Sequence, residues 1–491
     1  MAYLGRLRLG CLVRKDAVIY WTFNGIPHWL ITKRIGWFVF SVIDSTTIGR
    51  IPGKLSELLI HVFNTFYCAD NMFSFNHTGF RLGPSGRVQR SGFGGMIQDY
   101  EAYQECFNFK GASGTVCCLK CLNVIRGRDI SGHSCLHDIK TAKLEDCILR
   151  SANDLYAAAD ELDALAQQGL SITAFKKQEQ MRGLTYNPRG LLWYGPLRHV
   201  VNPVDGAIYD WFHCIIASGG PGSYHINALV GKILDVEVVT ASGCKTKPFT
   251  LKTLDDFMGD VITNLGEKPP KLQIAYNPEP GTQLKAMGNE VYAIASGLWL
   301  FVLLALVPAG LLPKHVECFA MLMTILDLLM HDDVVFERMD VLRHAISAHF
   351  DGYMELYTDL FKPKLHFTLH IPDMLLILGK NWNCMSPEAF HKVVKSYARN
   401  CMGPRRHAHV IRNMASNHFK VFMDSAWTKE VSSLSSHGGS PAGLGSDALR
   451  GLLPNLLKDG IIFVERWCSL HGFEATLPAC LPAPFPVVVQ K

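Results

Sequence analysis

The sequence predicts a mixed α/β protein, and three observations lead to this prediction. Two runs near the start, VIYWTF and GWFVFSVID, are rich in the aromatic and β-branched residues that favour strands. The stretch 140–170 predicts a helix, because Leu155 and Leu162 recur at helical spacing. From Val291 to Phe361 the apolar pattern is almost wholly helical. Early strands and late helices therefore predict a sheet-bearing region followed by a large helical one.

The composition bounds the class of protein. The 491 residues are enough for two or three domains, and 48% of them are hydrophobic against 19% charged. This balance excludes a chain that is disordered by composition. The net charge of +5 indicates a nucleic-acid partner only if it is clustered. The 15 cysteines occur without an apolar secretory segment in MAYLGRLRLG, so we expect an intracellular protein whose thiols bind metal rather than form disulfides.

The first 70 residues predict strands and turns, followed by a helix at 55–66. Asp44 ends the second strand-like run. It is either a metal ligand or, as the pattern favours, an ordinary strand-to-turn aspartate. Arginines among Gly and Ser at 80–98 suit either phosphate contacts or a solvated surface loop.

The run Val291–Leu312 has no charged residue and is long enough to span a bilayer. Pro308-Ala309-Gly310 interrupts its end, and helices rich in acidic residues follow it. These features favour a buried core helix, and a single membrane span is the alternative.

Cys118 and Cys121 form a C-x-x-C motif, whose spacing lets two thiolates reach one tetrahedral zinc ion. The sequence has no second motif of this kind nearby. The remaining ligands would therefore come from distant residues or from His133, Cys135 and His137. Ordinary buried cysteines are the alternative. A redox role is disfavoured, because no thioredoxin-like strand precedes the motif.

Two further pairs of residues could carry chemistry, and those of the first are both metal-capable types. Asp210 and His213 would share one face of a helical turn. An aspartate N-cap above a core histidine explains the same spacing. His366 and His370 form H-x-x-x-H, which lacks the inner glutamate of zinc proteases. The sequence contains no nucleophile elbow, Walker A loop or dinucleotide fingerprint.

A helix predicted after Ser386-Pro387 carries Glu388 at the head of a basic face. A carboxylate there fits a metal ligand beside a phosphate-binding surface, and a solvent-facing Glu–Lys pair is the alternative. The basic residues that would contact DNA are Lys392, Lys395, Arg399, Arg405 and Arg406.

These segments together resemble the core of CACTA-type DDE transposases, the CMC group, over residues 50–415. Four features match in order: an acidic residue ahead of a C-x-x-C, a D-x-x-H box followed by glycine, a Pro-Lys-x-His segment, and a helix with Glu, Lys, Tyr, Arg and Asn. They are Asp99 with Cys118 and Cys121; Asp210, His213 and Gly219; Pro363, Lys364 and His366; and Glu388, Lys392, Lys395, Tyr397, Arg399 and Asn400.

The resemblance implies an RNase H-like fold in which three carboxylates hold two Mg²⁺ or Mn²⁺ ions for DNA strand cleavage and transfer. Asp99 and Glu388 would be the second and third acids. Asp44 is the only stand-in for the first acid, and its surroundings do not match the family. We therefore expect an N-terminally truncated copy that lacks the first catalytic strand and does not cleave DNA.

The resemblance also implies that Asp210 and His213 support this site through structural zinc shared with Cys118 and Cys121. The expected partner is DNA and the expected compartment is the nucleus, with homo-oligomerisation left open. The main alternative is a zinc-stabilised nucleic-acid-binding protein without catalysis.

The sequence predicts four regions. They are the N-terminal part of the RNase H-like core at 1–140, a mixed insertion at 141–290, a helical region with the third-acid helix at 291–425, and a Ser/Gly/Pro-rich linker and tail at 426–491.

Overall fold

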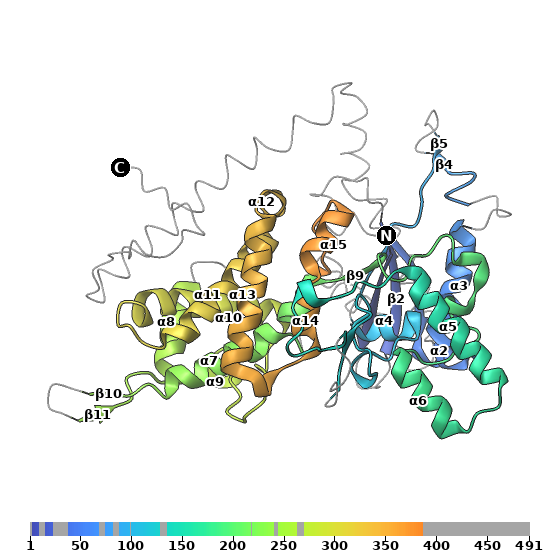
Figure 1. The fold of residues 1–491 in the computed structure, drawn as a ribbon. Helices are drawn as coiled ribbons and strands as arrows, with labels where there is room; N and C mark the ends of the chain where they lie inside the picture. The colour runs from blue at the N-terminus through green and yellow to red at the C-terminus, as the bar shows by residue number, and fades with distance from the viewer. Residues whose placement is uncertain are drawn as a thin grey trace, which may run out of the picture.

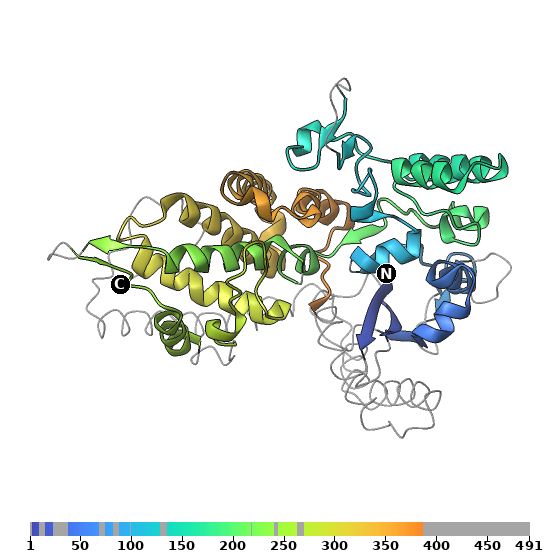
Figure 2. The ribbon, with the colours of Figure 1, turned by 90° about the horizontal axis from the view of Figure 1, so that it is seen from below.

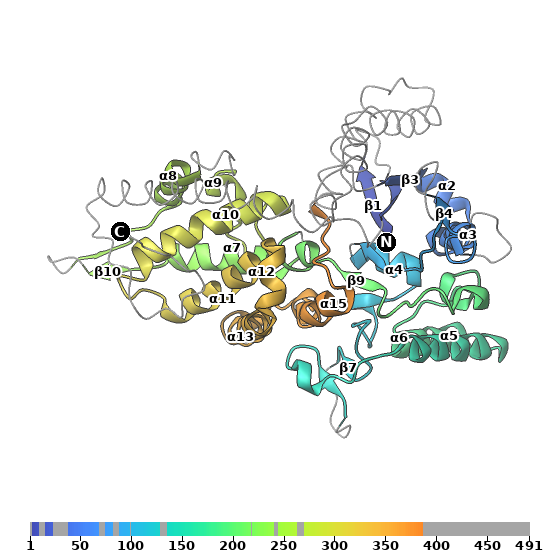
Figure 3. The same cartoon turned by 90° about the horizontal axis from the view of Figure 1, so that it is seen from above.

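The fold is described from a computed structural model, in which helices predominate over short strands. The described residues are 2–8, 15–22, 38–67, 74–81, 88–98, 100–127, 135–217, 219–239, 244–262 and 270–385. Figure 1 shows a sheet half, which contains the central sheet and helices α2 to α6, and a helical half, which contains α7 to α13. The two halves stay distinct from below (Figure 2) and from above (Figure 3). The chain is therefore a helix-rich α/β protein, as the sequence predicts.

The central sheet has five strands in the order β3–β2–β1–β6–β9. The first three, β1 (Ala2–Arg8), β2 (Lys15–Trp21) and β3 (Phe38–Asp44), pair antiparallel. β6 (Met96–Gln98) pairs parallel with β1, and β9 (Ala207–Tyr209) pairs parallel with β6. The runs VIYWTF and GWFVFSVID supply most of β2 and β3.

The two parallel strands β6 and β9 are wholly buried, as is usual for strands covered on both faces. Ile97 lies beside Ile208 in the register, and neither side chain reaches solvent. The hydroxyl of Tyr103 on α4 (Tyr100–Phe107) hydrogen-bonds to the carbonyls of Met96 and Ile208, which joins the helix to both strands. The carboxyl ends of β6 and β9 consequently lie side by side.

The helix predicted at 55–66 is α3 (Lys54–Tyr67), which follows α2 (Ser45–Arg50). It buries Leu55, Leu59 and Phe63 on one face. The hydroxyl of Ser56 donates to the carbonyl of Cys106 over 2.6 Å and accepts from the backbone N–H of Leu191 over 2.8 Å. The first bond fastens α3 to α4, and the second fastens it to the segment that begins at Leu191.

Short elements complete the sheet half. They are β4 (Phe80–Arg81), β5 (Val88–Gln89), η2 (Gly111–Ser113), β7 (Val124–Ile125), β8 (His137–Asp138), η3 (Leu144–Asp146), α6 (Ile172–Arg182), η4 (Leu191–Trp193), η5 (Gly195–Leu197) and the π-helical turn η6 (Phe212–Ile216).

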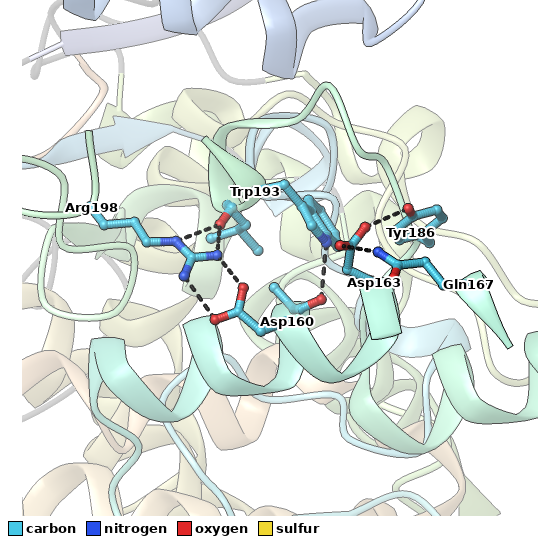
Figure 4. Close-up of polar contacts among 8 residues, drawn as sticks. Asp160, Asp163, Gln167, Tyr186, Trp193 and Arg198 are labelled. Atoms are coloured by element: carbon cyan, nitrogen blue, oxygen red, sulfur yellow. Dashed lines mark hydrogen bonds and ion pairs between the residues drawn. The ribbon is translucent and has the colours of Figure 1, made fainter. Parts of the chain in front are cut away.

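The helix predicted across 140–170 is shorter in the structure, where α5 runs from Ala152 to Gln167. It begins there because Ser151 accepts from the backbone N–H of Asp154 while Asp154 reaches back to Ser151, a capping box. Figure 4 shows how α5 is anchored to residues 186–198, which follow α6 (Ile172–Arg182). The contacts are Arg198 to both oxygens of Asp160 (2.8 and 2.6 Å), Tyr186 to Asp163 (2.7 Å) and the indole of Trp193 to the carbonyl of Ala159 (3.0 Å). Within α5, Gln167 also donates to Asp163 (3.1 Å).

The helical half begins at residue 221, well before the predicted boundary at 291. Its elements are α7 (Pro221–Leu234), β10 (Val238–Val239), β11 (Lys245–Thr246), α8 (Leu251–Ile262), α9 (Leu272–Ala275), α10 (Gly288–Phe301), η8 (Val302–Leu306), α11 (Pro313–Met330), α12 (Asp332–Glu337) and α13 (Met339–Tyr357). The two longest, α11 and α13, pack against each other.

The apolar run singled out in the sequence forms α10 and η8. By length and composition alone, Gly288–Leu306 could cross a membrane. In the structure it packs against α8 and α11, and every residue from Val291 to Val307 is buried or half-buried. This packing favours the core-helix interpretation.

After η9 (Thr358–Leu360), the chain returns to the sheet half through α14 (Pro363–Thr368) and α15 (Ile371–Leu378). These helices lie between the two halves (Figure 1). The ring of Phe367 lies 4.7 Å from that of Tyr100 and 5.1 Å from that of Tyr209, measured between centroids. α14 is thereby seated against α4 and β9.

Candidate metal centre

The loop that carries the two motif cysteines is fastened on both sides. Before them, the backbone N–H of Thr115 donates to the carbonyl of Gln180 (2.9 Å), and that of Lys110 donates to the carbonyl of Gly183 (2.7 Å). Gly183 adopts a positive φ of 69° at the end of α6, and a Cβ there would lie only 2.5 Å from the carbonyl oxygen of Val116. The cysteine loop therefore depends on a glycine at this close approach.

Between the cysteines, the backbone N–H of Leu119 donates to the hydroxyl of Tyr209 at the end of β9 (3.2 Å). The same hydroxyl lies 3.8 Å from the sulfur of Cys118. Cys121 forms an isolated antiparallel bridge with Leu149. These contacts point the two thiols toward the returning segment at α14.

Two histidines of that segment complete the group. His366 lies on α14 and His370 follows one turn later, so the i,i+4 spacing puts both imidazoles on one face. Their Nε2 atoms lie 3.4 Å apart. Both histidines reach the cysteines from far along the chain, 245 and 249 residues after Cys121. We call Cys118, Cys121, His366 and His370 the first Cys/His group.

The geometry of the first Cys/His group matches a tetrahedral ion. The sulfur of Cys121 lies 3.5 Å from Nε2 of His366 and 3.3 Å from Nε2 of His370, and the sulfur of Cys118 lies 3.4 Å from Nε2 of His370. With Zn–S bonds of about 2.3 Å and Zn–N bonds of about 2.0–2.1 Å, a zinc tetrahedron has S···N edges of about 3.5 Å and an N···N edge of about 3.3 Å. All four side chains are buried, so these donors could hold a metal such as zinc.

The electrostatics of the group favour a bound cation. Burial raises the pKa of Cys118, but hydrogen bonds with Cys121, His366 and His370 outweigh it and hold that pKa well below its ordinary value. The hydrogen bond to Cys118 raises the pKa of Cys121. One thiolate is thus already favoured, and metal binding would displace the second proton.

Two buried basic residues flank the thiols. Burial lowers the pKa of Lys120 to about 8 and also lowers the pKa of Arg150, while the nearby Cys118 and Cys121 oppose both shifts. The ammonium of Lys120 donates to the carbonyl of Val204. Nη1 of Arg150 has no hydrogen-bond partner in the described part of the chain. Their positive charge stabilises the thiolate form that a metal needs.

Asp210 and His213, expected to share zinc with the cysteines, lie in a separate group with Cys384. The carboxylate of Asp210 accepts from the backbone N–H groups of Phe212 (3.2 Å), His213 (3.2 Å) and Cys384 (3.0 Å). It also contacts Nδ1 of His213. The structure therefore pairs Cys118 and Cys121 with His366 and His370 instead.

Of the three expected catalytic acids, Asp44 alone lies among the described residues. Asp44 ends β3, whose neighbour at that point is Asp16 of β2. β3 is an edge strand, three positions from β6, which is about 14 Å at the usual strand spacing. Asp99 and Glu388 lie outside the described residues, as do the expected DNA-contacting residues Lys392, Lys395, Arg399, Arg405 and Arg406.

The spacing of His366 and His370 is the signal in the sequence for the second ligand pair. Two histidines four residues apart on a helix can ligate one metal ion without a glutamate between them. Among the nearby alternatives, His133 lies outside the described residues, Cys135 is exposed, and His137 lies on β8 outside the first Cys/His group.

No family model and no curated protein matches this chain.

Proposed function

We propose that the protein is a transposase-derived, RNase H-like DNA-binding protein, stabilised by zinc and without strand-transfer activity. The order and direction of the strands carry this proposal. In the sheet β3–β2–β1–β6–β9, the first three strands pair antiparallel in sequence order. β1 then pairs in parallel with β6, and β6 pairs in parallel with β9. This order and direction support an RNase H-like core.

The connections between the strands agree with the resemblance to DDE transposases. Asp99 directly follows β6, and the Asp210–His213 pair directly follows β9. The helical half then separates β9 from the segment with Glu388. In the sequence, Glu388 comes four residues after Cys384, whose N–H is bonded to Asp210. The proposal takes Asp99 and Glu388, which both lie outside the described residues, as the second and third acids.

β1 carries no candidate for the first acid. In the register, Leu4 of β1 is the neighbour of Gln98, and β1 has the sequence AYLGRLR without a carboxylate. Paired catalytic ions lie about 3.5–4 Å apart and share carboxylate ligands, which Asp44 on the far strand is too distant to provide. We therefore infer that the two-metal chemistry does not proceed in this chain.

The first Cys/His group would contribute stability rather than catalysis. Four protein ligands would occupy all four coordination positions of a tetrahedral zinc ion, as in structural zinc sites, and leave none for water or substrate. Zinc there would fasten the segment that returns from the helical half onto β9. In this proposal, the basic segment that includes Lys392 and Arg399, which lies outside the described residues, contacts DNA phosphates.

The test combines plasmid nicking with DNA binding by the purified full chain. With Mn²⁺, we expect no nicking of supercoiled plasmid by the wild type, Asp99→Ala or Glu388→Ala. We expect DNA binding that weakens with salt, and Lys392→Gln with Lys395→Gln should reduce the salt slope by about 2. Lys176→Gln with Lys177→Gln, on the exposed face of α6, is the matched control and should leave the slope unchanged.

Two results would contradict the proposal. Nicking by the wild type that both acid variants abolish would show a working two-metal site. Failure of the chain to bind DNA at low salt would remove the nucleic-acid function.

A further inference from the structure

A second group of metal-binding side chains lies inside the helical half. His225 comes from α7, Cys318 from α11 and His349 from α13. All three are at least 97% buried, and one ligand atom of each lies within 4.8 Å of the others. Nδ1 of His225 is 3.1 Å from Nε2 of His349, close to the N···N edge of about 3.3 Å in a tetrahedral zinc site.

The packing of α11 against α13 aims the thiol of Cys318 at this group. Gly352 of α13 faces it, and a Cβ at position 352 would lie 3.2 Å from the Cys318 sulfur. The ring of His225 lies 5.3 Å from that of His349 and 5.2 Å from that of Tyr357, between centroids. The three ligands thus meet where α7, α11 and α13 converge.

Polar atoms at this convergence have no partner in the described part of the chain. They are Nε2 of His225 and the hydroxyl of Tyr357, each buried from water. Two buried polar atoms beside the three ligands are therefore unsatisfied among the described residues.

The chemistry of the three donors selects the kind of ion. Two imidazole nitrogens and one sulfur suit zinc and its neighbours in the first transition series, whereas Mg²⁺ and Ca²⁺ require oxygen ligands. Burial holds the pKa of His225 well below its ordinary value and lowers that of His349 to about 4, so both rings are neutral at pH 7. Neutral imidazole is the form that ligates a metal.

We propose that His225, Cys318 and His349 bind a second transition-metal ion of the zinc class, which cross-links α7, α11 and α13 inside the helical half. On binding, the Cys318 thiol loses its proton to solvent and its sulfur bonds to the ion. This site is independent of the first Cys/His group, and no DNA chemistry is assigned to it.

The test is a metal count on the full chain loaded with Zn²⁺ and, separately, with Co²⁺. We expect two equivalents per wild-type chain. Cys318→Ser and His349→Asn should each retain one, with loss of part of the sulfur-to-Co²⁺ charge-transfer absorption in Cys318→Ser. Cys118→Ser with Cys121→Ser should also retain one. His344→Ala, an exposed histidine on α13, is the matched control and should retain two.

Circular dichroism of each variant shows whether the helices remain, and two variants with different chemistry guard against misfolding of either. Two equivalents in a folded Cys318→Ser and a folded His349→Asn would overturn the proposal. One equivalent in the wild type and none in Cys118→Ser with Cys121→Ser would overturn it while leaving the proposed function intact. One equivalent that survives the change at Cys118 and Cys121 would support the second site and remove the zinc of the proposed function.

Discussion

Individual side chains at the end of β9 connect the sheet to the first Cys/His group. The Tyr209 hydroxyl contacts the cysteine loop, and its ring stacks near Phe367 of α14. The carboxylate of the next residue, Asp210, accepts hydrogen bonds from three backbone N–H groups. This is the pattern of a capping carboxylate, the alternative that its spacing left open. Residue 209 therefore faces the metal ligands while residue 210 orders the backbone around it.

At the same scale, the buried hydroxyl of Tyr156 makes stability depend on pH. It donates to the carbonyl of Val201, and burial raises the pKa of Tyr156 to about 12, with Arg198 over the ring partly opposing the shift. The pKa of this hydroxyl in the unfolded chain is near 10. The stability that the buried neutral hydroxyl contributes is therefore complete below pH 10 and is lost as the pH rises toward 12.

We expect Tyr156→Phe to lower the free energy of unfolding by about 1 kcal/mol at pH 7. Between pH 10 and about 12 the wild type should lose stability relative to this variant, because only its unfolded state gains from ionisation. Urea unfolding of both proteins across this range measures the difference. A difference that does not change up to pH 12 would contradict the assignment.

Among the helices, α5 depends on its first residues. The capping box of Ser151 and Asp154 satisfies two N–H groups that the helix itself leaves free. Ser151→Ala should lower the free energy of unfolding by about 1 kcal/mol. Ser347→Ala, at an exposed interior position of α13, should have little effect. Equal losses for the two changes in urea unfolding would contradict the role of the cap.

The elements differ in how far the sequence predicts them. α3 shows a clear apolar stripe, and its predicted bounds agree with the structure within a residue. β6 and β9 have three residues each, too few to show a period of two, and their burial depends on helices distant in sequence. α5 was predicted too long because local periodicity does not register the cap at Ser151. The start of the helical half was missed because loop-like punctuation precedes and follows α7.

For the candidate metal centre, the sequence predicts the cysteine pair but not the histidines that lie beside it. Spacing identifies Cys118 and Cys121 as a ligand pair from local sequence alone. Nothing local joins them to His366, since 245 residues separate it from Cys121 and only the path of the chain through the helical half brings the two together. Asp210 and His213 are equally plausible zinc ligands by residue type and spacing. The sequence does not show that the Asp210 carboxylate accepts hydrogen bonds from three backbone N–H groups.

Across the whole molecule, the first Cys/His group links the cysteine loop to the segment that follows the helical half. Metal removal should therefore loosen those two segments before it affects the interior of the helical half. In hydrogen exchange, we expect chelation to reduce protection at residues 116–126 and 363–378 by at least about tenfold, which is about 1.4 kcal/mol.

Residues 152–167 of α5, which carry no ligand of either proposed metal site, are the internal reference. The Cys121→Ser variant provides the same comparison without a chelator. Uniform loss of protection across the molecule, or no loss at all, would contradict a local fastening by metal.

The points where the chain leaves and re-enters the sheet half are neighbours. The ammonium of Lys364 donates to the carbonyl of His213 over 2.9 Å, although 151 residues separate them. Closing a loop costs only about 0.6 kcal/mol more for each doubling of its length, provided that its ends already meet. Evolution could thus lengthen, shorten or replace the intervening helices at small thermodynamic cost. Because the sheet half holds the two ends of the helical insertion close together, we expect it to tolerate insertions of very different length at this position.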